Sequence, residues 1–537
     1  MYTGTLAIPH MLDNIIIVIY FVVVFGIGLY HSRRQKTAQE YFLAGHSVGW
    51  FAVGASLFST NISSEHFIGL AGSGASSGLA VGCYEWSASF CLFILGWLFV
   101  PYYMRSRVYT MPEFLERRFN AKCRWYLTII SLLAYVFTKI SVHLFAGAIL
   151  MREVLGWDYL TTSVLLVLAT GVYTITGGLK AVIYTDLFQS FVLITGAVVL
   201  SVIGLEKAGG FAGLRATLPP DFFHMIKPIN DPVYPWLGTT VGTMILGIWY
   251  WCTDQVIVQK TLSARGIKQA REGTFFCAAL KILPVFILVL PGLIAKSLYP
   301  DVVTGDNAYP TLVLRLLPSG LIGLMVAALL AALMSAMSSV LNSCSTLITI
   351  DIYRKLRPET SERRLVLIGR IATAAVVVLS IAWIPFIRYL SNEIYQYLQS
   401  VQAYVGAPIT AVFLTGVLWR GATARAAFTT LVTGGVLGGI RFLLDVLRNA
   451  FHWDLGPLNA VVTFSFLNFS VIVFVLCVVL MVAVSKWSPR APAQEIAELT
   501  VQWKGRLSGE EPRDRTRDII WTVLVGGIIL GMWIHFR

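Results

Sequence analysis

Charged residues are scarce in this chain. Of its 537 residues, 13% are Asp, Glu, Lys or Arg, whereas a soluble domain carries about 25%. Hydrophobic residues account for 56%, and the mean hydropathy is +0.72. This composition predicts a polytopic membrane protein and excludes an ordinary soluble domain.

Cysteine is also infrequent. The seven cysteines stand mostly alone within apolar runs and lack CxxC spacing, so they predict neither a disulfide framework nor a zinc site. The chain likewise has no pairing of a nucleophile with a base, no metal-ligand cluster and no phosphate-binding loop. The sequence therefore gives little support for an enzyme.

Long apolar runs, in contrast, are abundant. A spanning helix needs about 20 apolar residues, and this criterion predicts an all-α protein with about fourteen transmembrane helices. The first predicted span has no basic residue before it and HSRRQK after it, which predicts a signal anchor that is not cleaved. The predicted spans lie near residues 11–32, 48–73, 78–104, 124–152, 159–177, 181–205, 236–260, 272–299, 317–352, 365–387, 394–419, 423–447, 458–486 and 517–536.

The net charge of +13 would indicate a nucleic-acid partner in a soluble protein. Here the basic residues gather in alternate loops, all on one side if fourteen spans are correct. By the positive-inside rule that side is cytoplasmic and both termini lie outside, so the excess predicts topology and no nucleic-acid partner. The polar connection at about 487–516 is then a cytoplasmic loop, and EEPRDRTRD is expected to be solvated. The basic clusters are Arg33, Arg34 and Lys36; Arg105, Arg107, Arg117, Arg118 and Lys122; Lys260, Arg265, Lys268 and Arg271; Arg354, Lys355, Arg357, Arg363 and Arg364; Arg420 and Arg425; and Lys504, Arg506, Arg513, Arg515 and Arg517.

One predicted span is interrupted by polar residues. The stretch FSTNISSEHFIGLAGSGASSG, residues 58–78, contains Asn61, Glu65 and His66 beside four glycines. Polar or irregular backbone at membrane depth requires protein or water to satisfy it, and interrupted helices form ion and substrate sites in transporters. GLAGSGASSG alone favours close helix packing. The three polar side chains beside it favour a site.

Further polar groups lie where hydrocarbon disfavours them. Glu85 and Lys281 each interrupt an apolar run, at a cost of about 2.5 to 3.5 kcal/mol at a helix centre if unpaired. Each must face a cavity or a partner, and a structural ion pair is the alternative. Gln396, Gln399 and Gln402 recur on one helix face. A single glutamine could join helices, but three predict a hydrated path.

The clearest polar pattern lies in LAALMSAMSSVLNSCSTLITIDIY. Ser335, Ser338, Ser339, Asn342 and Thr346 form a stripe at helical spacing. Serines can bond to their own helix, which would leave the stripe without a function. Sodium prefers several oxygen ligands, which hydroxyls and freed carbonyls supply. The stripe therefore favours ion binding.

Seven motifs resemble a known family. They resemble the solute:sodium symporter family, in its sodium/glucose cotransporter branch, over nearly the whole chain. The resemblance implies a leucine-transporter-like fold of two five-helix inverted repeats, expected at 48–205 and 236–419. An additional helix and loop (1–47), an extracellular loop (206–235) and additional C-terminal helices (420–537) would flank them. The motifs are EYFLAGHSVGWFAVGASLFSTNISSEHFIGLAGSGASSGLA, YTMPEFLERRF, YTITGGLKAVIYTDLFQ, WYWCTDQVIVQKTLSA, ALKILPVFILVLPG, NSCSTLITIDIYRKLRP and YLQSVQAYVGAP.

The same resemblance implies a sugar site. Tyr250 would be the inner gate beneath the sugar, and Tyr84 and Tyr395 would help to close the outer side. Gly247 departs from the sugar carriers, which have an amide or hydroxyl there, so one sugar contact is absent. The implied sugar-binding residues are Asn61, His66, Glu85, Trp251, Lys281 and Gln399.

Two sodium positions are also implied. The main one would use backbone carbonyls of Ser59, Ile62 and Ala332 and the hydroxyl of Ser335, but the expected second hydroxyl is absent at Ala336. The second position, in members that use two ions, maps to three residues, the first of which could instead cap a helix after Thr185. Those residues are Asp186, Ser338 and Ser339.

The resemblance thus predicts a sodium-coupled symporter of a sugar such as glucose or galactose, which works by alternating access in the plasma membrane. Sodium is the expected co-transported ion, and the sugar and the lipid bilayer are the other expected partners. Two alternatives stay open. One is a sodium symporter for another solute, such as myo-inositol, a carboxylate or an amino acid. The other is a sugar-responsive channel or sensor, which the loss of a hydroxyl at Ala336 makes conceivable.

Overall fold

The computed structural model describes residues 11–32, 35–387, 394–449, 451–489, 492, 496–501 and 512–537. Within these residues the regular structure is helical, apart from two isolated β-bridges, Val48 with Ala264 and Lys227 with Pro235. The expected all-α class is confirmed. Both bridges join segments that connect helices.

The helices fall into long spans and short connecting pieces. Eleven π- or 3₁₀-helical segments lie between or within them: η1 (Ala44–His46), η2 (His66–Leu70), η3 (Gly78–Gly82), η4 (Leu95–Phe99), η5 (Tyr135–Ile140), η6 (Pro220–Phe223), η7 (Gly238–Gly242), η8 (Trp249–Thr253), η9 (Val285–Val289), η10 (Leu347–Tyr353) and η11 (Gly456–Leu458). The α-helices are α1 (Met11–Ser32), α2 (Ala38–Leu43), α3 (Trp50–Asn61), α4 (Ala71–Ser77), α5 (Cys83–Ile94), α6 (Val100–Ser106), α7 (Met111–Arg118), α8 (Ala121–Ala134), α9 (Ser141–Leu155), α10 (Tyr159–Lys207), α11 (Gly210–Thr217), α12 (Thr243–Ile248), α13 (Gln255–Leu262), α14 (Ile267–Leu280), α15 (Leu290–Leu298), α16 (Ala308–Leu316), α17 (Leu321–Thr346), α18 (Arg354–Leu356), α19 (Glu362–Ile387), α20 (Ile394–Leu418), α21 (Ala424–Asn449), α22 (Asn459–Thr463), α23 (Phe466–Lys486) and α24 (Pro512–His535).

The number of membrane spans follows from these helices. In the described residues, eleven helices are long and apolar enough to cross a membrane, and a bent pair makes a twelfth span. One of the eleven, α10, has 49 residues and would be about 74 Å long if straight, more than twice the hydrocarbon thickness. It breaks at Gly178 (φ 54°, ψ −161°), a conformation open essentially to glycine alone. Gly78 (φ 72°) likewise separates α4 from the span that follows. Division at these two glycines gives the predicted fourteen spans.

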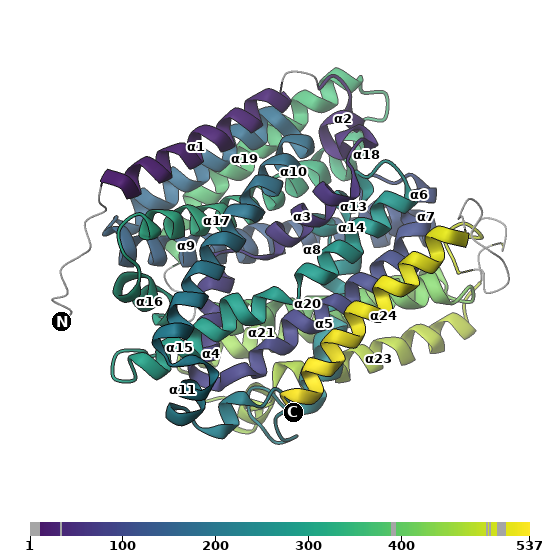
Figure 1. Cartoon of the computed structure of the whole chain (residues 1–537). Helices are drawn as coiled ribbons and strands as arrows, with labels where there is room; N and C mark the ends of the chain where they lie inside the picture. The colour runs from purple at the N-terminus through teal and green to yellow at the C-terminus, as the bar shows by residue number, and fades with distance from the viewer. Residues whose placement is uncertain are drawn as a thin grey trace.

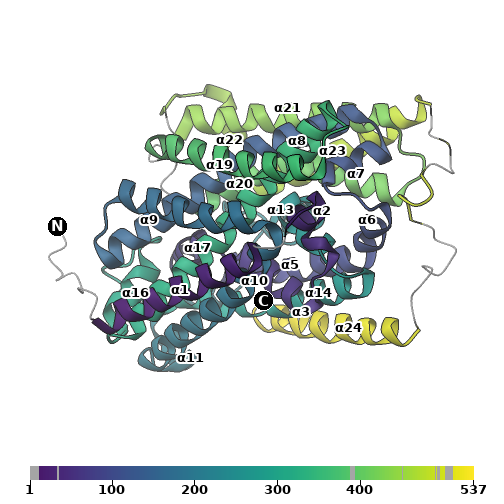
Figure 2. The same ribbon diagram turned by 90° about the horizontal axis from the view of Figure 1, so that it is seen from above.

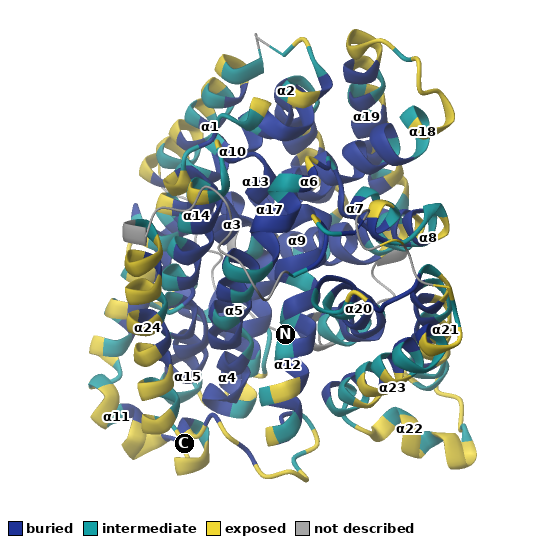
Figure 3. Cartoon of the chain, turned by 90° about the vertical axis from the view of Figure 1, so that its right-hand side faces the viewer, coloured by how far each residue is buried: buried dark blue, intermediate teal, exposed yellow. Residues whose placement is uncertain are grey.

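The interior of the molecule centres on α17. In its most apolar 18-residue window 89% of the residues are buried, and α1, α3, α10 and α19 pack around it. Figure 2 shows α21, α22 and α23 on one side of the molecule and α24 on the opposite edge. Figure 3 shows the buried interior around α17, α13 and α3, with exposed residues on α11, α22 and α24. Exposed α24 side chains such as Ile520 and Val523 are apolar, as contact with lipid requires.

The described basic connections lie together at one end of the molecule. Figure 1 shows α2, α6, α7 and α18 gathered there, opposite α11 and α16. Arg124 pairs with Asp351 at 2.7 Å and with Glu116 at 2.5 Å. The backbone N–H of Ala38 donates to Glu362 at 2.8 Å. A single basic end is what the fourteen-span topology requires, whereas the side of the membrane it faces stays a prediction.

Two details of the charge assignment were wrong. Lys260 and Arg271 are not loop residues but lie inside α13 and α14, where they are 1% and 2% exposed. The EEPRDRTRD stretch is not a solvated loop throughout, because α24 already begins at Pro512. Its Asp518 is buried and pairs with Arg271 at 3.3 Å. The rest of the 487–516 connection lies largely outside the described residues, as do Arg33 and Arg34.

Candidate functional site

The first broken span consists of α3, η2 and α4. Helix α3 ends at Asn61, Ile62 adopts extended dihedral angles (φ −79°, ψ 108°), and the helix resumes at Ser64. The last carbonyl groups of a helix have no partner within it. The break therefore frees backbone oxygens in the last turn of α3, near Ser59, where the resemblance implies sodium ligands.

The second broken span joins η7, α12 and η8 to α13, with a bend of 47°. The break falls at Asp254 (φ −74°, ψ 129°), whose carboxylate accepts from the Val256 N–H at 2.9 Å and so caps α13. The same carboxylate accepts from the Tyr135 hydroxyl at 2.7 Å and from Lys139 Nζ at 2.6 Å. The sequence analysis placed one continuous span at 236–260 and missed this break. An aspartate inside an apolar run was the available signal.

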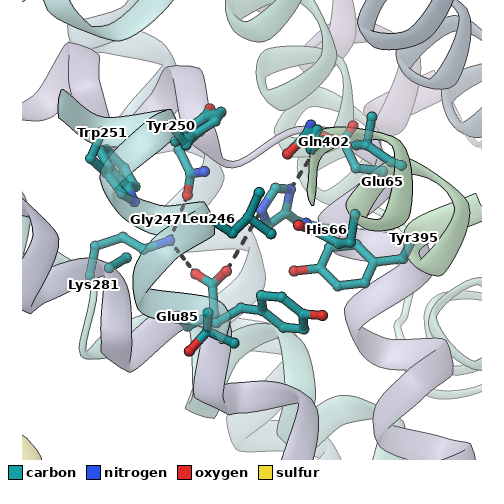
Figure 4. A pocket seen from close by; sticks show the side chains of 16 residues that line it. Glu65, His66, Glu85, Leu246, Gly247, Tyr250, Trp251, Lys281, Tyr395 and Gln402 are labelled. Carbon is teal, nitrogen blue, oxygen red and sulfur yellow. Dashed lines mark hydrogen bonds and ion pairs between the residues drawn. The ribbon is translucent and has the colours of Figure 1, made fainter. Parts of the chain in front are cut away.

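A cavity of about 500 Å³ lies between the two broken spans (Figure 4). The side chains that line it come from α3, η2, α5, α12, η8, α20 and the C-cap of α14. All seven residues that the sequence predicted for substrate border this one cavity: Asn61, His66, Glu85, Tyr250, Trp251, Lys281 and Gln399.

Charged and amide groups are linked across the cavity. Lys281 forms an ion pair with Glu85 and donates to Asn61 Oδ1 at 2.5 Å (Figure 4). His66 Nε2 lies 3.7 Å from Glu85 Oε1. Glu85 and Lys281 are 2% and 1% exposed, so the two charges that the sequence placed at membrane depth are each other's partners.

Aromatic and glutamine side chains form the remaining walls. The Tyr84 and Tyr395 rings meet edge to face with centroids 5.7 Å apart, and both border the cavity. Gln399 and Gln402 also line it, as expected for a polar helix face. The side chain of Gln396 lies outside the described residues.

A buried pair beside the cavity was missed. Glu65 Oε2 lies 2.6 Å from His143 Nδ1, and these two residues are 4% and 5% exposed. Glu65 Oε1 also lies 3.6 Å from His66 Nδ1. The sequence analysis singled out Glu65 as polar, but the distant His143 in an otherwise apolar run gave no spacing signal.

The side chain of Cys91 lies close to Gly247 and leaves little room for a larger residue there. It borders the cavity, and a Cβ atom at this position would lie 2.6 Å from Cys91 Sγ. The Cys91 side chain therefore occupies part of the space that a larger residue at 247 would need. The sequence predicted that one sugar contact is missing at Gly247. In the structure the Cys91 thiol packs against this same position.

A second cavity of about 290 Å³ adjoins the first. Five residues border both cavities: Asn61, Glu65, Tyr250, Leu398 and Gln402. The resemblance implies the inner gate at one of them, Tyr250. The second cavity is also lined by Lys139, His143 and Val340.

The residues of the main sodium position are all buried. Ser59, Ile62, Ala332 and Ser335 are 0% exposed and Ala336 is 1% exposed, and they lie on α3 and α17 or at the end of α3. These two helices contact each other, with Thr60 Oγ1 and Ser339 Oγ 3.0 Å apart. Within the part of the chain that the structure describes, the Ser59 hydroxyl has no hydrogen-bond partner, which suits an oxygen ligand. Ala336 faces the second cavity.

The residues of the second position lie together but are already paired. Asp186 is in the interior of α10 and accepts from Ser335 Oγ at 2.7 Å, so it does not cap a helix after Thr185. The hydroxyls of Ser338 and Ser339 both donate to the Ser335 carbonyl at 2.9 Å. Asp186 also forms an ion pair with Lys260.

The overall fold resembles solved transporters. A Na⁺-coupled sialic acid symporter, in a substrate-bound outward-open state, superposes with a TM-score of 0.76 over 90% of this chain and 99% of that chain at 23% identity. Because the sequence identity is only 23%, this similarity shows the fold alone. The protein thus has the leucine-transporter-like architecture of two inverted five-helix repeats with additional terminal helices, whereas the repeat boundaries stay a prediction.

Comparison of the amino-acid sequence with known proteins shows to which family the chain belongs. A model of the sodium:solute symporter family matches residues 41–434. Mouse sodium/glucose cotransporter 4 is 40% identical over 91% of this chain and 78% of its own length. Rabbit sodium/glucose cotransporter 1 is 39% identical over 94% and 83%, and mouse sodium/myo-inositol cotransporter is 39% identical over 83% and 69%. The chain belongs to the sodium:solute symporter family.

The Glu85–Lys281 pair provides a direct test of the site. We expect Lys281→Met to destabilise the protein by about 3 to 5 kcal/mol, because it leaves the buried Glu85 carboxylate without its ammonium partner and with His66 Nε2, 3.7 Å away, as its neighbour. Lys281→Met combined with Glu85→Gln removes both charges and should recover most of the stability. Thermal unfolding of the purified protein in detergent measures both effects.

The matched control is Lys207→Met, which removes an exposed lysine at the end of α10. A single Lys281→Met variant as stable as this control would show that Glu85 does not depend on the pair.

Proposed function

We propose that this protein is a sodium-coupled symporter that carries a hexose such as glucose or galactose by alternating access. The observation that carries the proposal is the convergence of seven predicted side chains on one cavity between two broken spans. Membership of the sodium:solute symporter family and about 40% identity to sodium/glucose cotransporters support it.

The cavity has the chemistry that a sugar requires. A hexose offers hydroxyls that both donate and accept hydrogen bonds. Glu85 accepts, Lys281 donates, and the amides of Asn61 and Gln399 do both. The Trp251 ring offers a surface for the apolar face of the sugar.

Coupling would act through the first broken span. Sodium bound by the freed carbonyls of α3 and by Ser335 of α17 would hold these two helices together. That contact stabilises the outward-facing state and so raises sugar affinity there. Sugar must then tighten sodium binding by the same factor. Separation of α3 from α17 on inward opening would release both, past Tyr250.

The membrane and orientation are part of the proposal. We place the protein in the plasma membrane with both termini outside, because the described basic connections share one end of the molecule. Antibody access to a terminal tag on intact cells checks this orientation. The family is one of transporters, and no enzymatic activity is proposed.

A polyol is the second candidate substrate. The myo-inositol cotransporter is 39% identical to this chain, close to the 40% of a glucose cotransporter. The hydroxyls of a polyol would suit the same donors and acceptors. A carboxylate substrate, in contrast, would meet the like charge of Glu85 in the cavity. A channel or sensor would bind a sugar without accumulating it.

Uptake into proteoliposomes tests these alternatives together. We expect radiolabelled glucose or galactose to accumulate only with an inward sodium gradient, and a panel that includes myo-inositol ranks the solutes. Binding without accumulation would favour the channel or sensor. Accumulation driven by a proton gradient and independent of sodium would overturn the sodium coupling.

Substitutions in the cavity should abolish sugar uptake in folded protein. Gln399→Ala removes one hydrogen-bonding partner of the sugar, worth about 1 to 3 kcal/mol, and Glu85→Ala removes a charged one, worth more. We expect sugar uptake at low concentration to fall about 5- to 150-fold for Gln399→Ala. Gln39→Ala and Glu206→Ala, at exposed positions, are the matched controls. Wild-type uptake by correctly folded cavity variants would contradict the assignment.

The main sodium position makes a second prediction. Ala336→Ser supplies the missing hydroxyl and should tighten apparent sodium affinity by about 1 kcal/mol, or roughly fivefold. Ser335→Ala should weaken it. Sugar uptake against sodium concentration measures both, with Ser201→Ala as the control because its hydroxyl donates to its own helix. An unchanged half-saturation in both variants would exclude this position as the coupling site.

A further inference from the structure

The second broken span contains one lysine, Lys260, and its ammonium group is deeply buried. It lies in α13, against which α3 and α17 pack, and its side chain is 1% exposed. Its Nζ donates to the Ser56 hydroxyl at 2.8 Å and to the Ser56 carbonyl at 3.3 Å. It also contacts Thr60 Oγ1 and the Asp186 carboxylate. Four oxygen atoms thus surround one positive charge.

The carboxylate of Asp186 accepts hydrogen bonds at both oxygens in this arrangement. Its Oδ2 accepts from Lys260 and from Ser56 Oγ at 2.6 Å, and its Oδ1 accepts from Ser335 Oγ at 2.7 Å. Asp186 is 0% exposed. The positive and negative charges cancel within the helix junction, as burial of charge requires.

This junction coincides with the second sodium position that the resemblance implies. The ammonium of Lys260 contacts the Asp186 carboxylate that would bind the ion. A second sodium beside Asp186 would lie next to a positive charge of equal size, without an uncompensated carboxylate to offset it. The residues present do not fit a second sodium.

We propose that the Lys260 ammonium is a tethered cation that takes the place of a second sodium at Asp186. The inference rests on the proposed symport function for its consequence, which is that one sodium ion accompanies each sugar. Removal of the lysine charge would leave Asp186, Ser56 and Thr60 as oxygen ligands around the vacated point, a set that suits sodium.

A purely structural ion pair would join the same helices. The two roles predict different numbers of bound sodium ions when Lys260 is replaced. If the ion pair is only structural, its loss lowers stability and creates no sodium site. A tethered cation that is removed leaves a site that a free cation can fill. Counting bound sodium therefore separates the two roles.

The experiment measures equilibrium binding of radiolabelled sodium to the purified protein, and then the ratio of sodium to sugar flux in proteoliposomes. We expect about one sodium per wild-type protein and about two for Lys260→Met, so that the flux ratio roughly doubles. Lys260→Arg keeps the positive charge and should stay at one. Lys260→Met combined with Asp186→Asn removes the carboxylate as well and should also stay at one, without an unpaired buried charge.

The result that overturns the proposal is a wild-type protein that binds two sodium ions, or a folded Lys260→Met variant that still binds one. The number of sodium ions bound by the wild-type protein is measured without any variant. The proposal can therefore be tested even if Lys260→Met folds poorly. Absence of sodium-driven sugar uptake by the wild-type protein would instead refute the proposed function. The binding counts would still decide whether Lys260 takes the place of an ion.

Discussion

A charge buried in this interior must have a partner, and the arrangement of the site follows from that requirement. An isolated charge in a medium of low dielectric constant is too costly to keep, whereas a buried pair is tolerated when its geometry is good. The charged side chains near the two breaks are paired in this way, and each pair connects a broken span, directly or through a hydrogen bond, to an element outside that span. The four pairs are Glu85 with Lys281, Glu65 with His143, Asp254 with Lys139, and Asp186 with Lys260.

These pairs constrain how the protein can move. A buried pair contributes little net stability, yet loss of one partner costs about 3 to 5 kcal/mol. A movement that separates the helices of a pair must therefore supply water or a ligand in place of the lost partner. Lys281 is placed for such an exchange, because it borders the cavity and already bonds both Glu85 and Asn61. A sugar hydroxyl can replace Asn61 there without leaving the ammonium unsatisfied. Lys260 borders neither cavity, so its pairing with Asp186 is expected to survive the transport cycle.

The sequence predicted the polar walls of the site better than the partners behind them. Glu85 and Lys281 were recognisable because each charge interrupts a long apolar run, and the structure places them in contact. Lys260 was assigned to a basic loop because the spacing of residues along a sequence does not show how deeply a side chain is buried. A lysine at the end of a span can point either to water or into the protein. His143 and Asp254 were missed for a related reason: the partner of each lies on another span, and a linear pattern does not say which spans meet. The all-α class and the number of spans were predictable because a spanning helix needs a long apolar run, whereas the leucine-transporter-like architecture was implied by the resemblance of the motifs.

Ser335 connects the two cation positions. Its hydroxyl donates its single proton to Asp186, and its carbonyl accepts from Ser338 and Ser339. A hydroxyl that has donated its proton still has lone pairs to offer, so the bond to Asp186 orients the oxygen of Ser335 in the way that the proposed main sodium position requires. Partners behind a ligand commonly fix its orientation in this way. The ammonium of Lys260 forms an ion pair with Asp186 and fixes the position of its carboxylate, which in turn maintains the orientation of Ser335. With Ala336 unable to supply a second hydroxyl, the proposed main position would depend on this one oriented oxygen and on the carbonyls freed by the break after Asn61.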